Sequence, residues 1–135
     1  MSIEPRGAVA KRVAPAGRIL IVEDDADGLE KLSELLEAAG YEVSVSCTGN
    51  AALALMPIVR PHVVVMDLRL PDADGVGLIR RLKAADDDTA IVVFSGSLAS
   101  EPAARAAGAD WFVPRPDRDT LERVLACLRD QKRPG

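Results

Sequence analysis

Residues 19–25 read Ile-Leu-Ile-Val-Glu-Asp-Asp, and they are the most informative segment of the sequence for the fold. Its first four residues are a short, continuous apolar run, which is typical of a strand buried on both faces of a sheet. Acids follow at once. Similar runs occur at residues 63–66 and 90–94, and the polar residues Asp67 and Ser95 follow them. The runs predict central strands with polar groups at their ends.

Helical spacing of apolar residues fills the segments between these runs. Two further strands are expected, an alternating one over residues 41–47 with Val43 and Val45 on one side, and a short one over 111–113. Five helices are expected. Apolar residues at helical spacing mark the first (Leu29, Leu32, Leu35, Leu36 and Ala39, closed by Gly40), the third (Val76, Ile79 and Leu82, after Asp74-Gly75) and the last (Leu121, Val124, Leu125 and Leu128). The second is expected over residues 49–56, capped by Thr48 and ended or kinked by Pro57, and the fourth is an Ala-rich helix that Ser100 caps and Gly108 ends.

Strand and helix therefore alternate five times, without an internal repeat. This pattern predicts the α/β class, with a doubly wound five-stranded parallel sheet and helices on both faces in a single domain. Ligands of such sheets bind outside the carboxyl ends of the strands. Residues 17–131 are expected to form the domain, between a flexible N-terminal tail (1–16) and a C-terminal tail (132–135).

Charge and composition exclude several classes. The formal net charge is −4, and Lys and Arg are scattered among acids, which argues against a nucleic-acid partner. No apolar run approaches the roughly 18 residues of a membrane span, and the first residues lack a secretory signal, so a cytoplasmic protein is expected. Cys47 and Cys127 lie in apolar stretches without metal-ligand spacing, and buried thiols are expected.

Polar residues gather where the predicted strands stop. Glu23 and Asp24 follow the first strand, Asp67 the third, and Arg115 the fifth, while Ser95 ends the fourth. Any one of them could be a loop acid or a helix cap, but their joint placement favours one site. Two charges about 4 Å apart repel by about 4 kcal/mol at an effective dielectric of about 20, so grouped acids need a cation or a proton. Oxygen ligands on an open rim suit Mg²⁺.

The chemistry of these side chains suggests phosphoryl transfer. An aspartate such as Asp67 can act as a nucleophile and form an aspartyl phosphate. The Ser95 hydroxyl and the permanent charge of Arg115 could contact phosphoryl oxygens.

Three motifs resemble the receiver domains of bacterial response regulators. They are residues 19–25, residues 64–75 (Val-Val-Met-Asp-Leu-Arg-Leu-Pro-Asp-Ala-Asp-Gly) and residues 108–116 (Gly-Ala-Asp-Trp-Phe-Val-Pro-Arg-Pro). The resemblance covers residues 18 to about 131 and implies the flavodoxin-like strand order 2-1-3-4-5.

The resemblance implies a role for each residue of the rim. Asp67 would be the phosphoacceptor, and Mg²⁺ would be bound by Glu23, Asp24, Asp67 and the backbone carbonyl of Arg69. Ser95 and Phe112 would be the hydroxyl and aromatic residues that move on phosphorylation. Asp25 is as compatible with a cap for the first helix as with a role in the site. A cis peptide is expected at Arg115-Pro116.

The resemblance also implies a signalling function. Asp67 would be phosphorylated by a histidine kinase or a histidine phosphotransfer protein, and phosphorylation would control binding to a downstream protein, with a homodimer possible. The chain would not be an enzyme beyond self-catalysed phosphoryl transfer and autodephosphorylation. A phosphatase of similar fold would usually need an acid where Arg69 stands.

Two departures support an alternative. Receiver domains normally have Lys where this chain has Arg115, and the guanidinium is longer and binds as a fork. The segment from Ser95 to Arg115 is also about two residues shorter than usual. Both favour a pseudo-receiver that docks partners without being phosphorylated. Four intact residues of the rim oppose it: Glu23, Asp24, Asp67 and Ser95. His62 is expected to be a strand-edge residue, and Trp111 either packs under a helix or lies exposed.

Overall fold

The predicted strands form one parallel sheet. They are β1 (Arg18–Val22), β2 (Glu42–Ser46), β3 (Val63–Met66), β4 (Ala90–Ser95) and β5 (Trp111–Pro114). Their order is β2-β1-β3-β4-β5, and every neighbouring pair is parallel. The predicted fold class and strand order are confirmed. The structure is a computed structural model that describes residues 17–132. The predicted N-terminal tail (1–16) and all of the predicted C-terminal tail (132–135) except Lys132 lie outside the described residues.

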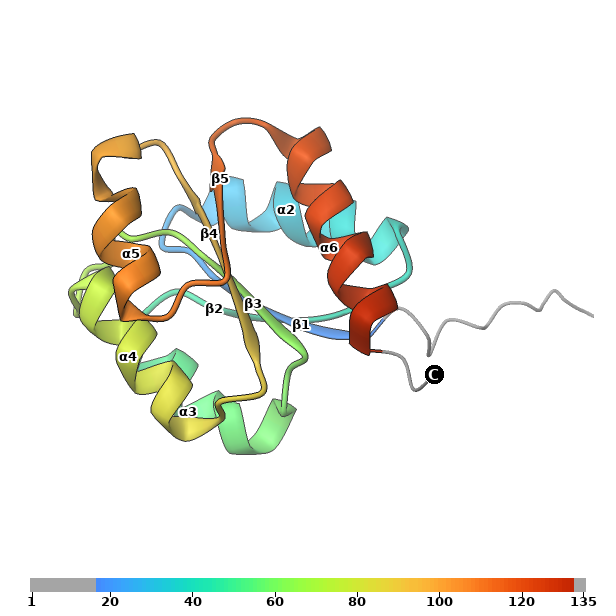
Figure 1. Ribbon diagram of the computed structural model, residues 1–135. Helices are drawn as coiled ribbons and strands as arrows, with labels where there is room; N and C mark the ends of the chain where they lie inside the picture. The colour runs from blue at the N-terminus through green and yellow to red at the C-terminus, as the bar shows by residue number, and fades with distance from the viewer. Residues whose placement is uncertain (1–16, 133–135) are drawn as a thin grey trace, which may run out of the picture.

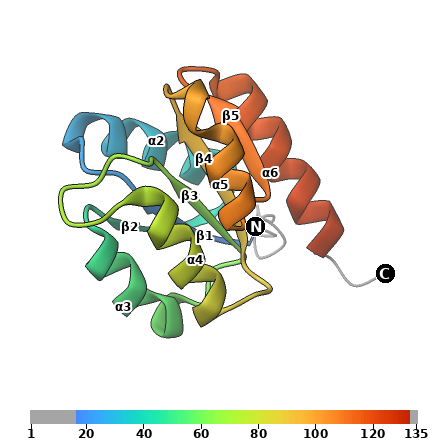
Figure 2. The ribbon, with the colours of Figure 1, turned by 60° about the vertical axis from the view of Figure 1, so that its left-hand side comes forward.

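Helices cover both faces of the sheet (Figures 1 and 2). They are α2 (Ala26–Ala38), α3 (Gly49–Val59), α4 (Gly75–Ala85), α5 (Glu101–Ala107) and α6 (Arg118–Lys132), with a short 3₁₀ helix, η2 (Leu98–Ser100), before α5. Helices α2 and α6 lie on one face, and α3, α4 and α5 on the other. No helix in residues 17–132 has the length and apolar composition needed to cross a bilayer.

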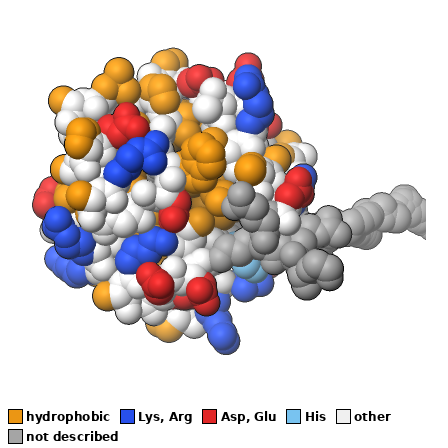
Figure 3. Space-filling model, in the orientation of Figure 1, with side chains coloured by type: hydrophobic (Ala, Val, Ile, Leu, Met, Phe, Trp, Pro, Cys, Tyr) orange, Lys and Arg blue, Asp and Glu red, His pale blue; other side chains and the backbone are white. Residues whose placement is uncertain are grey.

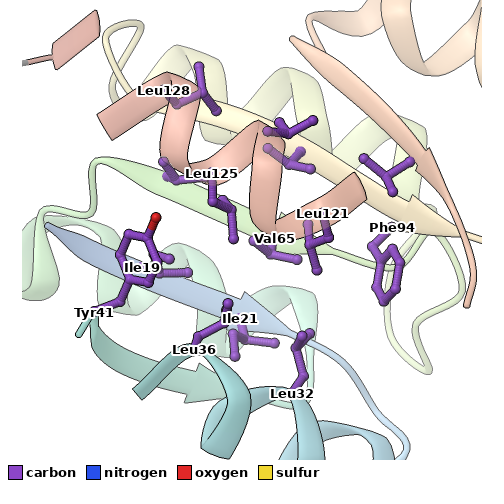
Figure 4. Close-up of a cluster of buried hydrophobic side chains, with 14 of the residues drawn as sticks. Ile19, Ile21, Leu32, Leu36, Tyr41, Val65, Phe94, Leu121, Leu125 and Leu128 are labelled. Atoms are coloured by element: carbon purple, nitrogen blue, oxygen red, sulfur yellow. The ribbon is translucent and has the colours of Figure 1, made fainter. Parts of the chain in front are cut away.

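Alternate residues of each strand supply two hydrophobic cores. Ile19 and Ile21 of β1 pack toward α2 and α6, whereas Leu20 and Val22 pack toward α3, α4 and α5. The period-2 side-chain pattern of a strand causes this division. Figure 4 shows the first core, which extends to Phe94 at the end of β4. Because both faces are covered, the central strands must be apolar throughout.

Two sequence predictions about exposure and helix length are wrong. Cys47 and Cys127 were expected to be buried, but both are exposed. Cys47 follows the end of β2, and Cys127 lies outside the stripe of α6 that faces the sheet. Helix α3 continues past Pro57 to Val59, since a proline near the end of a helix removes only one intrahelical hydrogen bond.

Four smaller expectations are resolved by packing. Val43 packs against the first core, but Val45 on edge strand β2 is 44% exposed. Trp111 is exposed, which decides between the two alternatives for it. Ser100 precedes α5 without a side-chain capping bond, because its hydroxyl is hydrogen-bonded to that of Ser97 at 2.9 Å.

On the face drawn in Figure 3, basic and acidic side chains are interspersed.

The loop between β3 and α4 closes tightly against the first turn of α4. A Cβ atom on Gly75 would come within 2.4 Å of the Leu68 carbonyl oxygen, so only glycine fits there. Arg69 and Asp74 form an antiparallel bridge across the loop. The Asp74 side chain also accepts a hydrogen bond from the backbone of α4 at 3.2 Å. The chain is thereby fixed in the segment directly after Asp67.

We expect Gly75→Ala to lower the free energy of unfolding by about 1–3 kcal/mol, because backbone atoms of Leu68 would have to move. The matched control is Gly77→Ala in the same helix, where the nearest atom to an added Cβ is 3.5 Å away. That change should be neutral or slightly stabilising. Urea denaturation of both variants measures the difference, and equal stability of the two would contradict the steric argument.

Candidate functional site

The site lies at the carboxyl edge of the sheet, where the strands end in register. Val22 pairs with Met66, and Ser95 pairs with Pro114. The backbone ladder then continues one residue further, because Asp67 N–H donates to the Val22 carbonyl at 3.2 Å and Arg115 N–H donates to the Ser95 carbonyl at 3.1 Å. The sheet itself therefore holds the backbone of the predicted site residues in position.

Asp67 carries a half-buried carboxylate at this edge. Its Oδ1 accepts a long hydrogen bond from Arg69 N–H at 3.4 Å. Within residues 17–130 no Lys, Arg or His side chain forms a salt bridge with it. A carboxylate that is anchored through its backbone and has few side-chain partners can accept a metal ion or act as a nucleophile.

Glu23 and Arg115 form a largely buried ion pair. Glu23 is 2% exposed, and its Oε1 accepts a hydrogen bond from Arg115 Nη2. Its Oε2 accepts the backbone N–H of Asp25 at 3.1 Å. Arg115 Nε donates to the Phe94 carbonyl at 2.7 Å, and its guanidinium carbon lies 4.6 Å from the centre of the Phe94 ring. The Glu23 carboxylate, the Phe94 carbonyl and the Phe94 ring thus fix the position of the guanidinium.

Ser95 and Phe112 lie behind the edge. Ser95 is buried, and its Oγ accepts the Ser97 N–H at 3.1 Å, which leaves the hydroxyl proton available for another acceptor. Phe112 is buried in the core beneath α3, α4 and α5. The Arg115–Pro116 peptide bond is cis, as expected from the sequence.

The remaining acids after β1 differ in role. Asp24 is exposed at the edge of the sheet. Asp25 is the N-cap of α2, and its side chain accepts the Gly28 N–H at 3.1 Å. Asp25 therefore acts as a helix cap, which decides between its two readings.

Asp72 braces the loop that follows Asp67, a role that sequence reasoning missed. Its carboxylate accepts N–H groups at the start of α3, from Gly49 at 2.7 Å and from Asn50 at 2.9 Å. These two backbone hydrogen bonds, that from Asn50 foremost, lower the pKa of Asp72 below its usual value. Because the partners are more than twenty residues earlier, no local signal could have revealed this contact.

The residues present fit Mg²⁺ through two carboxylates. Within residues 17–132, no group of three or more His, Cys, Asp or Glu side chains is placed to hold a metal ion. Glu23 is engaged by Arg115, whereas Asp24 and Asp67 at this edge have no salt-bridge partner among the side chains of residues 17–130. Mg²⁺ commonly takes one or two carboxylates and completes its shell with water and phosphate oxygens. The Arg69 carbonyl is the further protein oxygen expected from the sequence.

Comparisons with known proteins agree with this geometry. The family model described as the response regulator receiver domain matches residues 19–126. Transcriptional regulatory protein PrrA of Mycobacterium leprae is 36% identical over 116 residues, which cover 83% of this chain and 50% of PrrA. The chain thus spans about half the length of that relative.

Solved structures share the fold. A CheY-like receiver domain protein from Methanospirillum hungatei is 31% identical, with a TM-score of 0.78 over 85% of this chain and 95% of that one. The receiver domain of sensor histidine kinase PA1611 from Pseudomonas aeruginosa has a TM-score of 0.77 at 24% identity, over 84% of this chain and 97% of that one. That structure has a magnesium ion coordinated in its active site cleft.

We expect Asp72→Ala to destabilise the protein in a pH-dependent way. The folded-state pKa of Asp72 is lowered, so its contribution is present above the unfolded pKa of about 4 and is lost as the pH falls through the folded value. The difference in free energy of unfolding between parent and variant should be clear at about pH 7 and shrink at about pH 3. Urea denaturation at both pH values measures it. Asp87→Ala, an exposed acid, is the control, and a difference that is the same at both pH values would refute the assignment.

Proposed function

The chain belongs to the response regulator receiver domain family, and we propose that it is a phosphoacceptor domain phosphorylated on Asp67. The observation that carries the proposal is the Asp67 carboxylate, which lies at the carboxyl edge of the sheet without a salt-bridge partner in residues 17–132. Receiver domains of response regulators act with histidine kinases and downstream effectors. The donor would accordingly be a histidine kinase or a histidine phosphotransfer protein.

Asp67 would attack the phosphorus of the donor directly. An Oδ atom forms the new P–O bond, the bond from phosphorus to the donor nitrogen breaks, and the electron pair leaves with the imidazole. Asp24, Asp67 and the Arg69 carbonyl would hold Mg²⁺, which neutralises the phosphoryl oxygens when it is bound. The hydrogen bond between Asp67 N–H and Val22 holds the nucleophile in place during the attack.

Ser95 and Arg115 would stabilise the transferred group. The Ser95 hydroxyl has a proton to donate, since its oxygen acts as the acceptor for Ser97. A guanidinium has five N–H groups, and two of those on Arg115 are engaged by Phe94 and Glu23, so others remain for a phosphoryl oxygen. Movement of Ser95 toward the phosphoryl group, followed by Phe112, would carry the change to the surface that a downstream protein recognises.

One observation favours a second function, a pseudo-receiver that docks partners without phosphorylation. Arg115 is committed to Glu23 and Phe94, which would limit its movement toward a phosphoryl group. The accessible carboxylate of Asp67 favours the first function. A direct test of phosphorylation separates the two.

We expect one phosphoryl group per chain after exposure to a small phosphodonor with Mg²⁺, measured by intact-protein mass spectrometry. Asp67→Asn should abolish labelling, since the amide is not a nucleophile of this kind. Asp24→Asn should label only at higher Mg²⁺ concentration, because one metal ligand is weakened.

Asp87→Asn, an exposed acid in the loop before β4, is the matched control and should label like the parent. A parent that remains unlabelled supports the pseudo-receiver instead. Full labelling of Asp67→Asn would show that another residue is the acceptor.

A further inference from the structure

We infer that the N-terminal segment of this chain (residues 1–16) docks into the groove between the C-terminal ends of α3 and α4, with Lys11 and Arg12 against the acidic loop at residues 86–88. This groove lies at the amino edge of the sheet, where β1 begins, whereas Asp67 lies at the carboxyl edge. The inference therefore goes beyond the proposed function and does not depend on phosphorylation.

The groove is large enough for a short stretch of side chains. Helices α3 and α4 end side by side (Figures 1 and 2), and the groove between their ends has a volume of about 460 Å³. Pockets of about 300–1,000 Å³ commonly hold ligands. The lining comes from the last turn and the C-cap of α3 and from the end of α4: Met56, Pro57, Arg60, Ala85 and Asp86.

Hydrogen bonds fix the acidic loop beside the segment that follows α3. The Thr89 hydroxyl is buried and donates to the Pro61 carbonyl at 3.0 Å. Within the loop, Asp86 Oδ1 accepts the Asp88 N–H at 3.0 Å. Both sides of the groove are therefore held in place by contacts within the domain.

The chain enters the domain next to this groove. The Arg18 side chain lies across the C-terminal end of α3, where Nη2 and Nε donate to the Arg60 carbonyl at 2.9 and 3.0 Å. Its Nε also donates to the Val59 carbonyl at 3.1 Å. Because Arg60 lines the groove, the start of β1 is only one arginine side chain away from it.

The acidic loop is within reach of the basic pair in the N-terminal segment. Ile19 and Ala90 both pair with Val63, so β1 and β4 begin about 10 Å apart at this edge. Lys11 and Arg12 precede the first described residue by six and five positions. Six extended residues span up to about 20 Å, so both side chains can reach the loop.

The charges of the two partners are complementary. The groove and its loop contain three acids and one basic residue, which are Asp86, Asp87, Asp88 and Arg60. Asp86 and Asp87 form no salt bridge with a side chain of residues 17–130. The N-terminal segment has the reverse balance, with three basic residues and one acid: Arg6, Lys11, Arg12 and Glu4.

Apolar residues and covalent attachment add to the charge pairing. Val9 and Val13 flank the basic pair and suit the apolar part of the lining at Met56 and Pro57. Each exposed ion pair is weak by itself. Attachment to β1, however, gives the segment an effective concentration in the roughly millimolar range at the groove. The segment is therefore favoured over a free partner of the same chemistry.

Paramagnetic relaxation enhancement on the full chain tests the inference. A nitroxide is attached at Ala10→Cys in a chain that carries Cys47→Ser and Cys127→Ser. Amide signals at the ends of α3 and α4 should broaden several-fold more than those at the end of α2. That end is the matched reference, because it lies on the other face of the same edge, where the Glu42 N–H donates to the Gly17 carbonyl at 3.0 Å.

Two variants of the labelled chain remove the charges on either side. Lys11→Gln combined with Arg12→Gln should lower the excess broadening, and so should Asp86→Asn, which keeps the oxygen that accepts the Asp88 N–H. Glu37→Gln, an exposed acid at the end of α2, is the matched control and should leave the excess unchanged. About 1 M NaCl should also lower it, because the Debye length falls to about 3 Å.

Three results would overturn the inference. The first is equal broadening on the two faces of the parent, which means that the segment does not dock. The second is an excess that persists unchanged in both charge variants. The third comes from a mixture of nitroxide-labelled chains with ¹⁵N-labelled chains that carry no nitroxide, because excess broadening there shows that the segment docks on a second copy.

Discussion

The register of the parallel sheet positions every other part of the molecule. Parallel strands end at a common edge, and hydrogen bonds from Glu23, Asp67 and Arg115 extend the ladder one residue past it. Residues from distant parts of the chain are thereby brought to one rim. Their side chains can be polar because they leave the sheet where the helices no longer cover it. The buried runs behind them, in contrast, must be apolar on both faces.

Electrostatics then divides the acids of that rim into two kinds. Glu23 is buried and would be costly to keep charged without a counter-ion, which Arg115 supplies. Asp24 and Asp67 are more accessible and have no such partner among the described residues. The acids that adjoin one another in sequence thus differ in what they can bind.

The loop after Asp67 is stabilised from two sides. Gly75 permits the close approach of the Leu68 backbone, and Asp72 binds the N-terminus of α3. Neither contact touches the carboxylate of Asp67, but both limit how far the following backbone can move. As the nucleophile that we propose, Asp67 would therefore need little reorganisation before it reacts. The same loop supplies the Arg69 carbonyl that we propose as a metal ligand.

The fold class and the residues at the rim could be predicted from the sequence, and the strand order from the family resemblance. These follow from patterns that are local, such as the apolar run of residues 19–22 and the acids after it, and from motifs in a fixed order. The partner of each charged side chain, in contrast, became known from the three-dimensional structure. The contact of Arg115 with Glu23 joins residues 92 positions apart, and the contact of Asp72 with α3 joins residues more than twenty positions apart. The exposure of Cys47 and Cys127 likewise depends on how segments distant in the sequence pack around them. Local spacing carries no information about such contacts, because they exist only after the sheet has brought the segments together.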